Sequence, residues 1–216
     1  MKQKMRKDKM RLLMLLMLMA SLCVPGNVLG QITLNISGAG TETDPYQIDS
    51  PEALAWFRDW VNGTYVPGEN ETAVSHKTAW AKLTADIDMR SVCHPADEAN
   101  GIEELSWTPI SNSDVKWNGS FDGGGHTISN LYINTTSDNA GLFGYVGDYS
   151  YINTKFYIKD IIFSNVNITS TGKNSGVLAG STLTKTTVSG ITVESGTVNG
   201  TSYSGGIVGY ANYSVK

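Results

Sequence analysis

Asp122 and His126 are the strongest catalytic candidates in the sequence, because they flank three consecutive glycines that favour a tight corner. Hydrolysis of a glycoside requires two carboxyl groups about 5–10 Å apart. A lyase requires a base beside a group that neutralises charge. The sequence places no second acid or base to complete either arrangement, so we predict that the chain is not an enzyme.

Asp86 and Asp88 are the best candidates for a metal site. They lie two residues apart, so on a strand they share a face, and carboxylate oxygens are ligands that Ca²⁺ prefers. Such a pair is more commonly part of a solvated face, and we predict no metal and no cofactor. Cys93 and His94 are adjacent, point to opposite sides of an extended chain and have no second Cys/His pair, so we interpret them as a loop thiol beside a loop histidine.

Three similar segments would form the scaffold for these side chains. Each has a short apolar strand, a variable loop and a small-apolar-apolar-Gly strand. The apolar strands begin near Leu131, Ile161 and Ile191, which follow each other at equal intervals along the chain. The closing glycines are Gly144, Gly180 and Gly209. Within each strand apolar residues alternate with polar ones, which indicates one buried face.

A repeat of roughly 30 residues, with short strands and glycine corners, predicts a β-solenoid whose turns stack in parallel. We therefore predict a mostly β fold, with repeats over residues 107–216. A sandwich of antiparallel hairpins is the competing interpretation, but it predicts no register of similar segments. The side chains predicted to point inward are Ile161, Phe163, Ile191, Val193 and Val208.

Residues 31–106 are predicted to form an N-terminal cap region with first strands and one helix over about residues 51–62. Ser50 and Pro51 are typical of a helix start, and Leu54, Phe57 and Val61 form an apolar stripe. We interpret Phe57 and its tryptophan neighbours, Trp56 and Trp60, as core packing and not as an aromatic ligand site. The C-terminal end has no comparable capping pattern, so we expect it to be incomplete and to self-associate or to continue into further repeats.

The segment 1–30 has the pattern of a signal peptide. Residues 1–11 contain six basic residues and one acidic residue, an apolar run extends from Leu12 to Val24, and small residues precede Gln31. We predict cleavage near Gly30/Gln31 and a secreted or cell-surface location. The remaining chain carries 10 basic and 19 acidic residues and has no other run of membrane length, which argues against nucleic-acid binding and a stable membrane span.

Several stretches together resemble secreted bacterial proteins that carry GLUG motifs, many of them from Bacteroidetes. They are GTETDPYQIDSPEALAWFRDWVNG, LTADIDM, WTPI, GSFDGGGHTISNLYI, AGLFGYV and GGIVGY. The resemblance implies a right-handed parallel β-helix of the pectate-lyase-like class and an adhesin-like protein. The motif also occurs in larger surface proteins, including some immunoglobulin A proteases. The glycines of the motif are Gly141, Gly144, Gly176, Gly180, Gly205, Gly206 and Gly209.

These observations predict an exported, non-catalytic surface or adhesion module that binds a host or bacterial surface protein or glycan. Two alternatives remain open. One is a polysaccharide-active or glycan-binding accessory domain, and the other is the N-terminal part of a larger surface enzyme.

Overall fold

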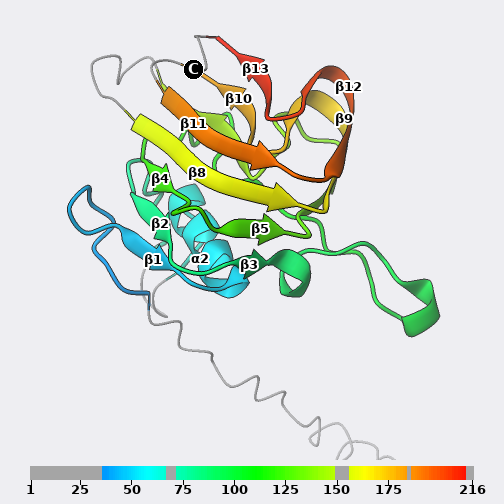
Figure 1. Ribbon diagram of the computed structural model, residues 1–216, viewed down its shortest axis with the longest axis horizontal. Coiled ribbons are helices and arrows are strands. Elements are labelled where there is room, and N and C mark those ends of the chain that lie inside the picture. Colours follow the sequence, from blue (N-terminus) through cyan, green and yellow to red (C-terminus); the bar gives the residue numbers. More distant parts are fainter. Residues whose placement is uncertain (1–35, 67–71, 149–155, 184–185, 213–216) are drawn as a thin grey trace, which may run out of the picture. The chain divides into compact units, whose positions relative to one another are not determined.

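The computed structural model describes residues 36–66, 72–148, 156–183 and 186–212 (Figure 1). The predicted signal peptide and its cleavage site lie outside these residues. The described residues all belong to one compact unit, Ile36–Lys216, which we call the second unit because it follows Met1–Asn35.

The second unit is mostly β, and all pairings between its described strands are parallel. Within the described residues the strands form three sheets. The largest sheet contains β1 (Tyr46–Ile48), β2 (Ala81–Leu83), β3 (Ile87–Asp88), β4 (Phe121–Asp122), β5 (Thr127–Ser129), β8 (Phe156–Ser164) and β11 (Thr186–Val193). A second sheet contains β6 (Tyr132–Thr135), β9 (Val166–Gly176) and β12 (Gly196–Gly205). The third contains β7 (Phe143–Val146), β10 (Ala179–Thr182) and β13 (Val208–Ala211).

The chain passes through the three sheets in the same order three times, and each passage forms one layer. The first layer is β4–β7, the second is β8–β10 and the third is β11–β13. Successive layers pair in register, so that Ile161 lies beside Ile191, and Ala179 lies between Phe143 and Val208. Parallel pairing begins before residue 107, since β2 and β3 already pair with β4 and β5.

The register of the first layer differs from the expected alignment of Leu131 with Ile161. The structure pairs Ile133 with Ile168, and the partner of Phe163 is Ile128 in β5. The cause is that each layer has two corners of similar sequence, a left-handed residue followed by alternating apolar residues. The first layer is separated from the second by more residues than the second is from the third, as the pairs Ile133–Ile168 and Ile161–Ile191 show. An alignment at equal spacing therefore places one corner of the first layer opposite the other corner of the second.

Large aromatic side chains fill the space between the sheets. Phe121, Phe143, Trp107 and Trp117 are fully buried, and the rings of Trp117 and Phe143 stack with centroids 4.8 Å apart. The buried indole N–H groups keep hydrogen bonds, because Trp107 Nε1 donates to the carbonyl of Leu142 and Trp117 Nε1 donates to that of Ala79. Burying these rings therefore contributes hydrophobic stabilisation without the cost of unpaired donors.

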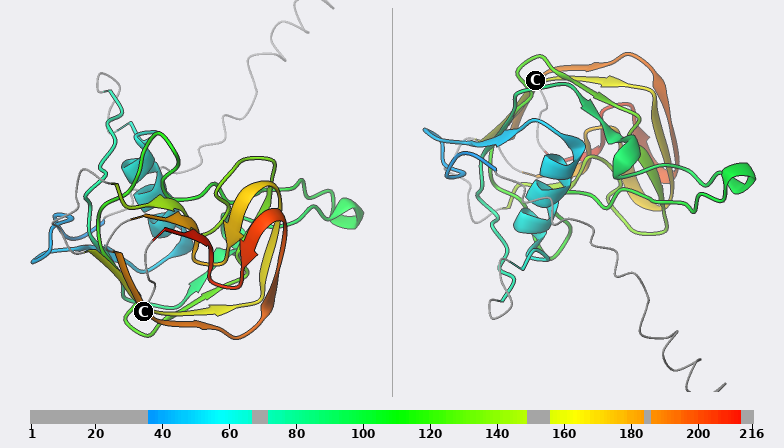
Figure 2. Two further views of the ribbon diagram at one scale, coloured as in Figure 1. Left: turned by 90° about the horizontal axis from the view of Figure 1, so that it is seen from above. Right: turned by 90° about the horizontal axis from the view of Figure 1, so that it is seen from below.

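Helix α2 (Pro51–Asn62) lies where the sequence predicts a helix and closes one end of the layers (Figure 2, right). The Ser50 hydroxyl caps its first turn by accepting the Ala53 N–H, and Gly63 ends it in the left-handed conformation. Phe57 is fully buried and its ring lies 6.1 Å from that of Phe121, which belongs to the first layer. The helix thus covers apolar side chains that would otherwise face water.

Asparagines occupy one corner of the first two layers. Asn139 and Asn174 adopt the left-handed region at φ 65° and 62°, which asparagine tolerates better than most residues. The side-chain amide of Asn174 donates a hydrogen bond to Asn139 Oδ1, which also accepts one from the Ser181 hydroxyl. In the third layer the equivalent left-handed residue is Tyr203, at φ 46°, which cannot continue this ladder of amides.

Candidate functional site

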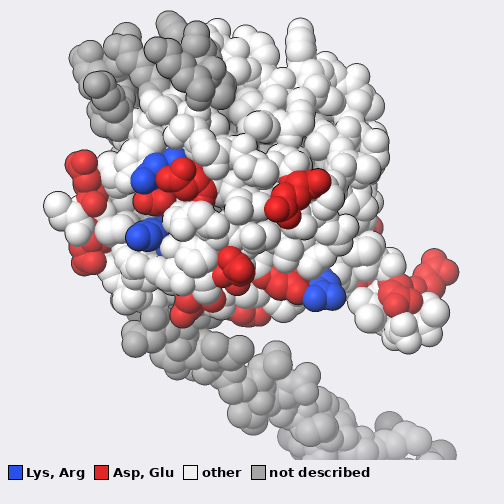
Figure 3. Space-filling view, viewed as in Figure 1, with Lys and Arg blue, Asp and Glu red and all other residues white. Residues whose placement is uncertain are grey.

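A shallow groove of about 540 Å³ runs over the outer face of the largest sheet. Asp122 comes from β4, and Lys159 and Asp160 come from β8. The glycines at 124, 125 and 190 have no side chains that would fill the groove. Figure 3 shows basic and acidic side chains lying against each other over these strands. The charged side chains that line the groove suit a charged or polar ligand.

Lys159 is held between two carboxylates in this groove. Its Nζ lies 3.1 Å from Asp122 Oδ2 and 3.5 Å from Asp160 Oδ2. The hydrogen bond to Asp122 raises the pKa of Lys159, so the side chain is an ammonium at neutral pH and cannot accept a proton from a substrate. Asp122 also accepts the N–H of Gly124 through its other oxygen, which fixes the corner.

His126 contacts a different acid from the one that the sequence suggested. Its Nδ1 lies 3.1 Å from Asp86 Oδ1, and the same oxygen accepts the N–H of Thr127. These contacts, the Thr127 N–H first, lower the pKa of Asp86. Asp122 and His126 therefore have different partners, Lys159 and Asp86 respectively. Sequence reasoning missed Lys159, which lies beside Asp122 in the register of β4 and β8.

Asp88 has different partners from those of Asp86. It pairs with Arg90 and accepts a hydrogen bond from the Asn130 amide, and the Arg90 contact holds the pKa of Asp88 well below its usual range. No group of three or more His, Cys, Asp or Glu side chains in the described ranges is placed to hold a metal ion. The carboxylates of Asp86 and Asp88 thus interact with neighbouring side chains and backbone N–H groups in this structure.

Cys93 is fully buried beside the first layer. Its Sγ accepts the N–H of Tyr132 at 3.3 Å, and burial raises the pKa of the thiol to about 11. His94 Nδ1 lies 3.1 Å from the carbonyl oxygen of Pro95. A protonated, buried thiol is a poor nucleophile, so the structure gives Cys93 a packing role.

The glycines of the repeat motif allow close approach of backbones. A Cβ on Gly176 would lie 2.7 Å from the backbone nitrogen of Gly209, and one on Gly180 would lie 2.3 Å from the backbone of Asn139. Gly141, Gly144, Gly205 and Gly209 are similarly crowded by neighbouring backbone atoms. Gly206 is the exception among the motif glycines, because nothing lies within 4 Å of its Cβ position.

Trp56 and Trp60 are not core residues, which corrects the sequence interpretation, whereas Phe57 is fully buried. Both tryptophans are half-buried, with their rings stacked 5.5 Å apart at an interplanar angle of 16°. The other face of Trp60 stacks on His76 at 3.6 Å and 5°. Tyr46 and Tyr65 contact the tryptophans edge-on, and we call these five rings the aromatic cluster.

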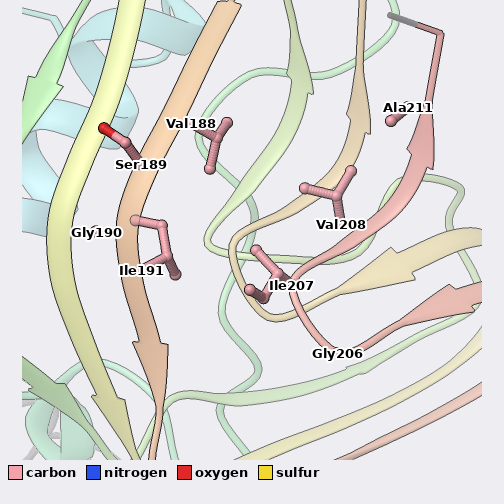
Figure 4. A pocket seen from close by; sticks show the side chains of 8 residues that line it. All are labelled: Val188, Ser189, Gly190, Ile191, Gly206, Ile207, Val208 and Ala211. Atoms are coloured by element: carbon pink, nitrogen blue, oxygen red, sulfur yellow. The ribbon is translucent and has the colours of Figure 1, made fainter. Parts of the chain in front are cut away.

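The outer face of the third layer forms an apolar hollow of about 600 Å³, which we call the open end (Figure 4). Side chains of Val188, Ile191, Ile207 and Val208 line it. Phe163 and Ile161 are completely buried, as predicted. Ile191, Val193 and Val208 also point toward the interior enclosed by the three sheets. They are half-exposed because, among the described residues, no fourth layer is stacked on the third.

Comparisons with known proteins give two partial relatives. The chain is 31% identical over 167 residues to halomucin from Haloquadratum walsbyi, an alignment that covers 74% of this chain and 2% of that protein. It is 27% identical over 112 residues to a protein of Evansella cellulosilytica provisionally named a Gly-rich membrane protein, covering 51% of this chain and 10% of that one. The chain thus spans a small fraction of both relatives. No family model matches the sequence.

One solved structure shows limited likeness. It is a protein of Bacteroides ovatus provisionally described as an immunoglobulin A1 protease, with 17% identity and a TM-score of 0.37 over 82% of this chain and 65% of that one. A likeness at that TM-score carries no argument about fold or activity. In the described part of this chain, helices are too short or too polar to cross a bilayer.

Proposed function

We propose that this chain is an exported, non-catalytic surface module of the GLUG-motif type, which binds a protein or glycan and has the fold of a right-handed parallel β-helix. Three parallel layers in register support the β-helix, since each layer buries its inward face against the next. The partial similarity to halomucin and to a Gly-rich membrane protein supports a surface location.

The observation that carries the binding function is the aromatic cluster on the cap helix. Core packing does not require these rings, because the buried stripe of α2 already consists of Ala53, Leu54, Phe57 and Val61. The two tryptophans stay half-buried, and Trp and Tyr dominate the energetic centres of interfaces. Tyr65 is 37% exposed and lies against both tryptophans, so the cluster reaches the surface.

A binding experiment tests this assignment. The secreted chain is applied to a glycan array and to immobilised host surface proteins, and bound ligands are titrated with Trp56→Ala. Trp80→Ala is the matched control, because Trp80 is also a half-buried tryptophan and contacts Tyr157 on the outer face of the largest sheet. We expect Trp56→Ala to weaken binding by about tenfold or more. Equal affinity for both variants would contradict the assignment to the aromatic cluster.

The groove beside Lys159 favours a second candidate, a glycan-binding or polysaccharide-active accessory domain. Two carboxylates and an ammonium can donate and accept hydrogen bonds with sugar hydroxyls. Lys159 is an ammonium and offers no base, and its contacts with Asp122 and Asp160 occupy both carboxylates, so we favour binding without cleavage. Assays for new reducing ends and for unsaturated uronides decide the point. Activity that disappears in Asp122→Ala or His126→Ala would replace the non-catalytic proposal with this alternative.

A further inference from the structure

The open end leaves apolar side chains in water that are covered elsewhere in the molecule. Ile161 is fully buried beneath Ile191, whereas Ile191 itself is half-exposed. The same contrast holds for Leu178 of the second layer, which is fully buried, and the half-exposed Ile207 of the third. A further layer placed on this hollow would bury these side chains, as the third layer buries those of the second.

Strands β11, β12 and β13 also carry unpaired backbone. Each pairs along one edge only within the described residues, with β8, β9 and β10 respectively. Soluble proteins usually protect such edges with charged residues or proline. Residues 186–212 contain a single charged side chain, Glu194, and no proline. The surface at β12 is correspondingly white in Figure 3.

Tyr203 is a second, independent sign of a contact at this end. It adopts φ 46°, a conformation that costs a bulky side chain energy, where the two preceding layers have asparagine. Its side chain is 65% exposed and meets the ring of Tyr210, which is 40% exposed, at 5.8 Å. Two exposed tyrosines in contact on the outermost layer are typical of the composition of an interface.

The charge and shape of the two ends identify the occupant. Helix α2 covers the opposite end, so in head-to-tail stacking the open end of one copy would meet this helix and not another apolar hollow. The open end is nearly uncharged, so two identical open ends can meet without the repulsion that like charges would cause.

We propose that two copies of this chain associate through their open ends to form a closed, two-fold symmetric dimer. A two-fold axis in the plane of the contact makes the facing strands antiparallel. One of the three strands then faces the same strand of the second copy, and each of the other two faces the other one's counterpart. The two apolar hollows then cover each other. The proposal rests on the layered fold and is independent of the ligand of the aromatic cluster.

Sedimentation equilibrium of the secreted chain over a range of concentrations tests the dimer. The average mass should rise from one copy to two and then stop, because a two-fold contact uses up both open ends. Amide hydrogens of β11–β13 should become protected over the same concentrations. A chain that stays monomeric throughout, or a mass that grows beyond two copies, would overturn the proposal.

Two variants separate the contact from the fold. Ile191→Lys puts a charge into each hollow and should leave the chain monomeric, with Ser113→Lys in an exposed loop as the matched charge control. Tyr203→Asn restores the residue type of the earlier layers, so it should weaken the dimer about tenfold while keeping or raising the thermal stability of the monomer. A dimer as tight in both variants as in Ser113→Lys would refute the assignment, whatever the ligand-binding assays show.

Discussion

Ile161 and Ile191 allow a comparison of one side chain in a covered and an uncovered layer. They are paired partners on β8 and β11 and both point inward, but Ile161 is 0% exposed and Ile191 is half-exposed. Removing a fully buried Ile side chain costs about 2–5 kcal/mol, through lost burial and the cavity that remains. We expect Ile161→Ala to fall in that range. Ile191→Ala should cost about 1–2 kcal/mol, because part of the side chain is already in water and no closed cavity forms.

Equilibrium urea unfolding at a protein concentration where the chain is monomeric gives the two values. The lost β-propensity is the same in both variants and cancels in their difference. At high concentration the cost of Ile191→Ala should increase, because dimerisation stabilises the folded state by mass action. Equal costs for the two variants in the monomer would show that the open end is covered. A cost below about 1 kcal/mol for Ile161→Ala would show that the inward face is misassigned.

Three further outcomes follow from the site geometry. Gly180→Ala should destabilise the chain by about 1–3 kcal/mol through overpacking against Asn139, while Gly206→Ala should stay within about 0.5 kcal/mol, and thermal unfolding would measure both. Cys93 should resist iodoacetamide in the folded protein at mildly alkaline pH and react in urea, which mass spectrometry can follow; rapid native labelling would contradict its burial. Since contacts lower the pKa of Asp88, its stabilising effect is present above the ordinary carboxyl pKa of about 4 and is lost as the pH falls below it. Asp88→Asn should therefore lower the melting temperature near neutral pH more than in strong acid, and a gap that widens on acidification would contradict the sign.

The sequence predicts the repeated part of the structure well because its signal is periodic. Gly180 and Gly209 stack as expected, and the pairing of Ile161 with Ile191 follows the equal spacing of the apolar strands. The spacing fails at Leu131, because the two corners of a layer have similar sequences and layers differ in length. Handedness and the β-helix itself stay predictions, since no sequence pattern distinguishes them here.

The polar contacts are harder to predict, since they join residues from different layers. Asp122 and His126 are neighbours in sequence, but their partners Lys159 and Asp86 are about 40 residues away in opposite directions. The partial exposure of Trp56 and Trp60 is also difficult to predict from the sequence. An apolar stripe shows which helix positions can be buried, but it does not show how wide the buried face is.

The closed end of the molecule has a consequence for how the chain acquires its structure during synthesis. Helix α2 and the first strands leave the ribosome before any repeat does, so each later segment can add to an edge that is already ordered. Every addition joins segments about one layer apart in the sequence, which keeps the entropic cost of each step small and similar. Growth then has one direction, and the surface most prone to mispairing at any moment is the most recently added strand.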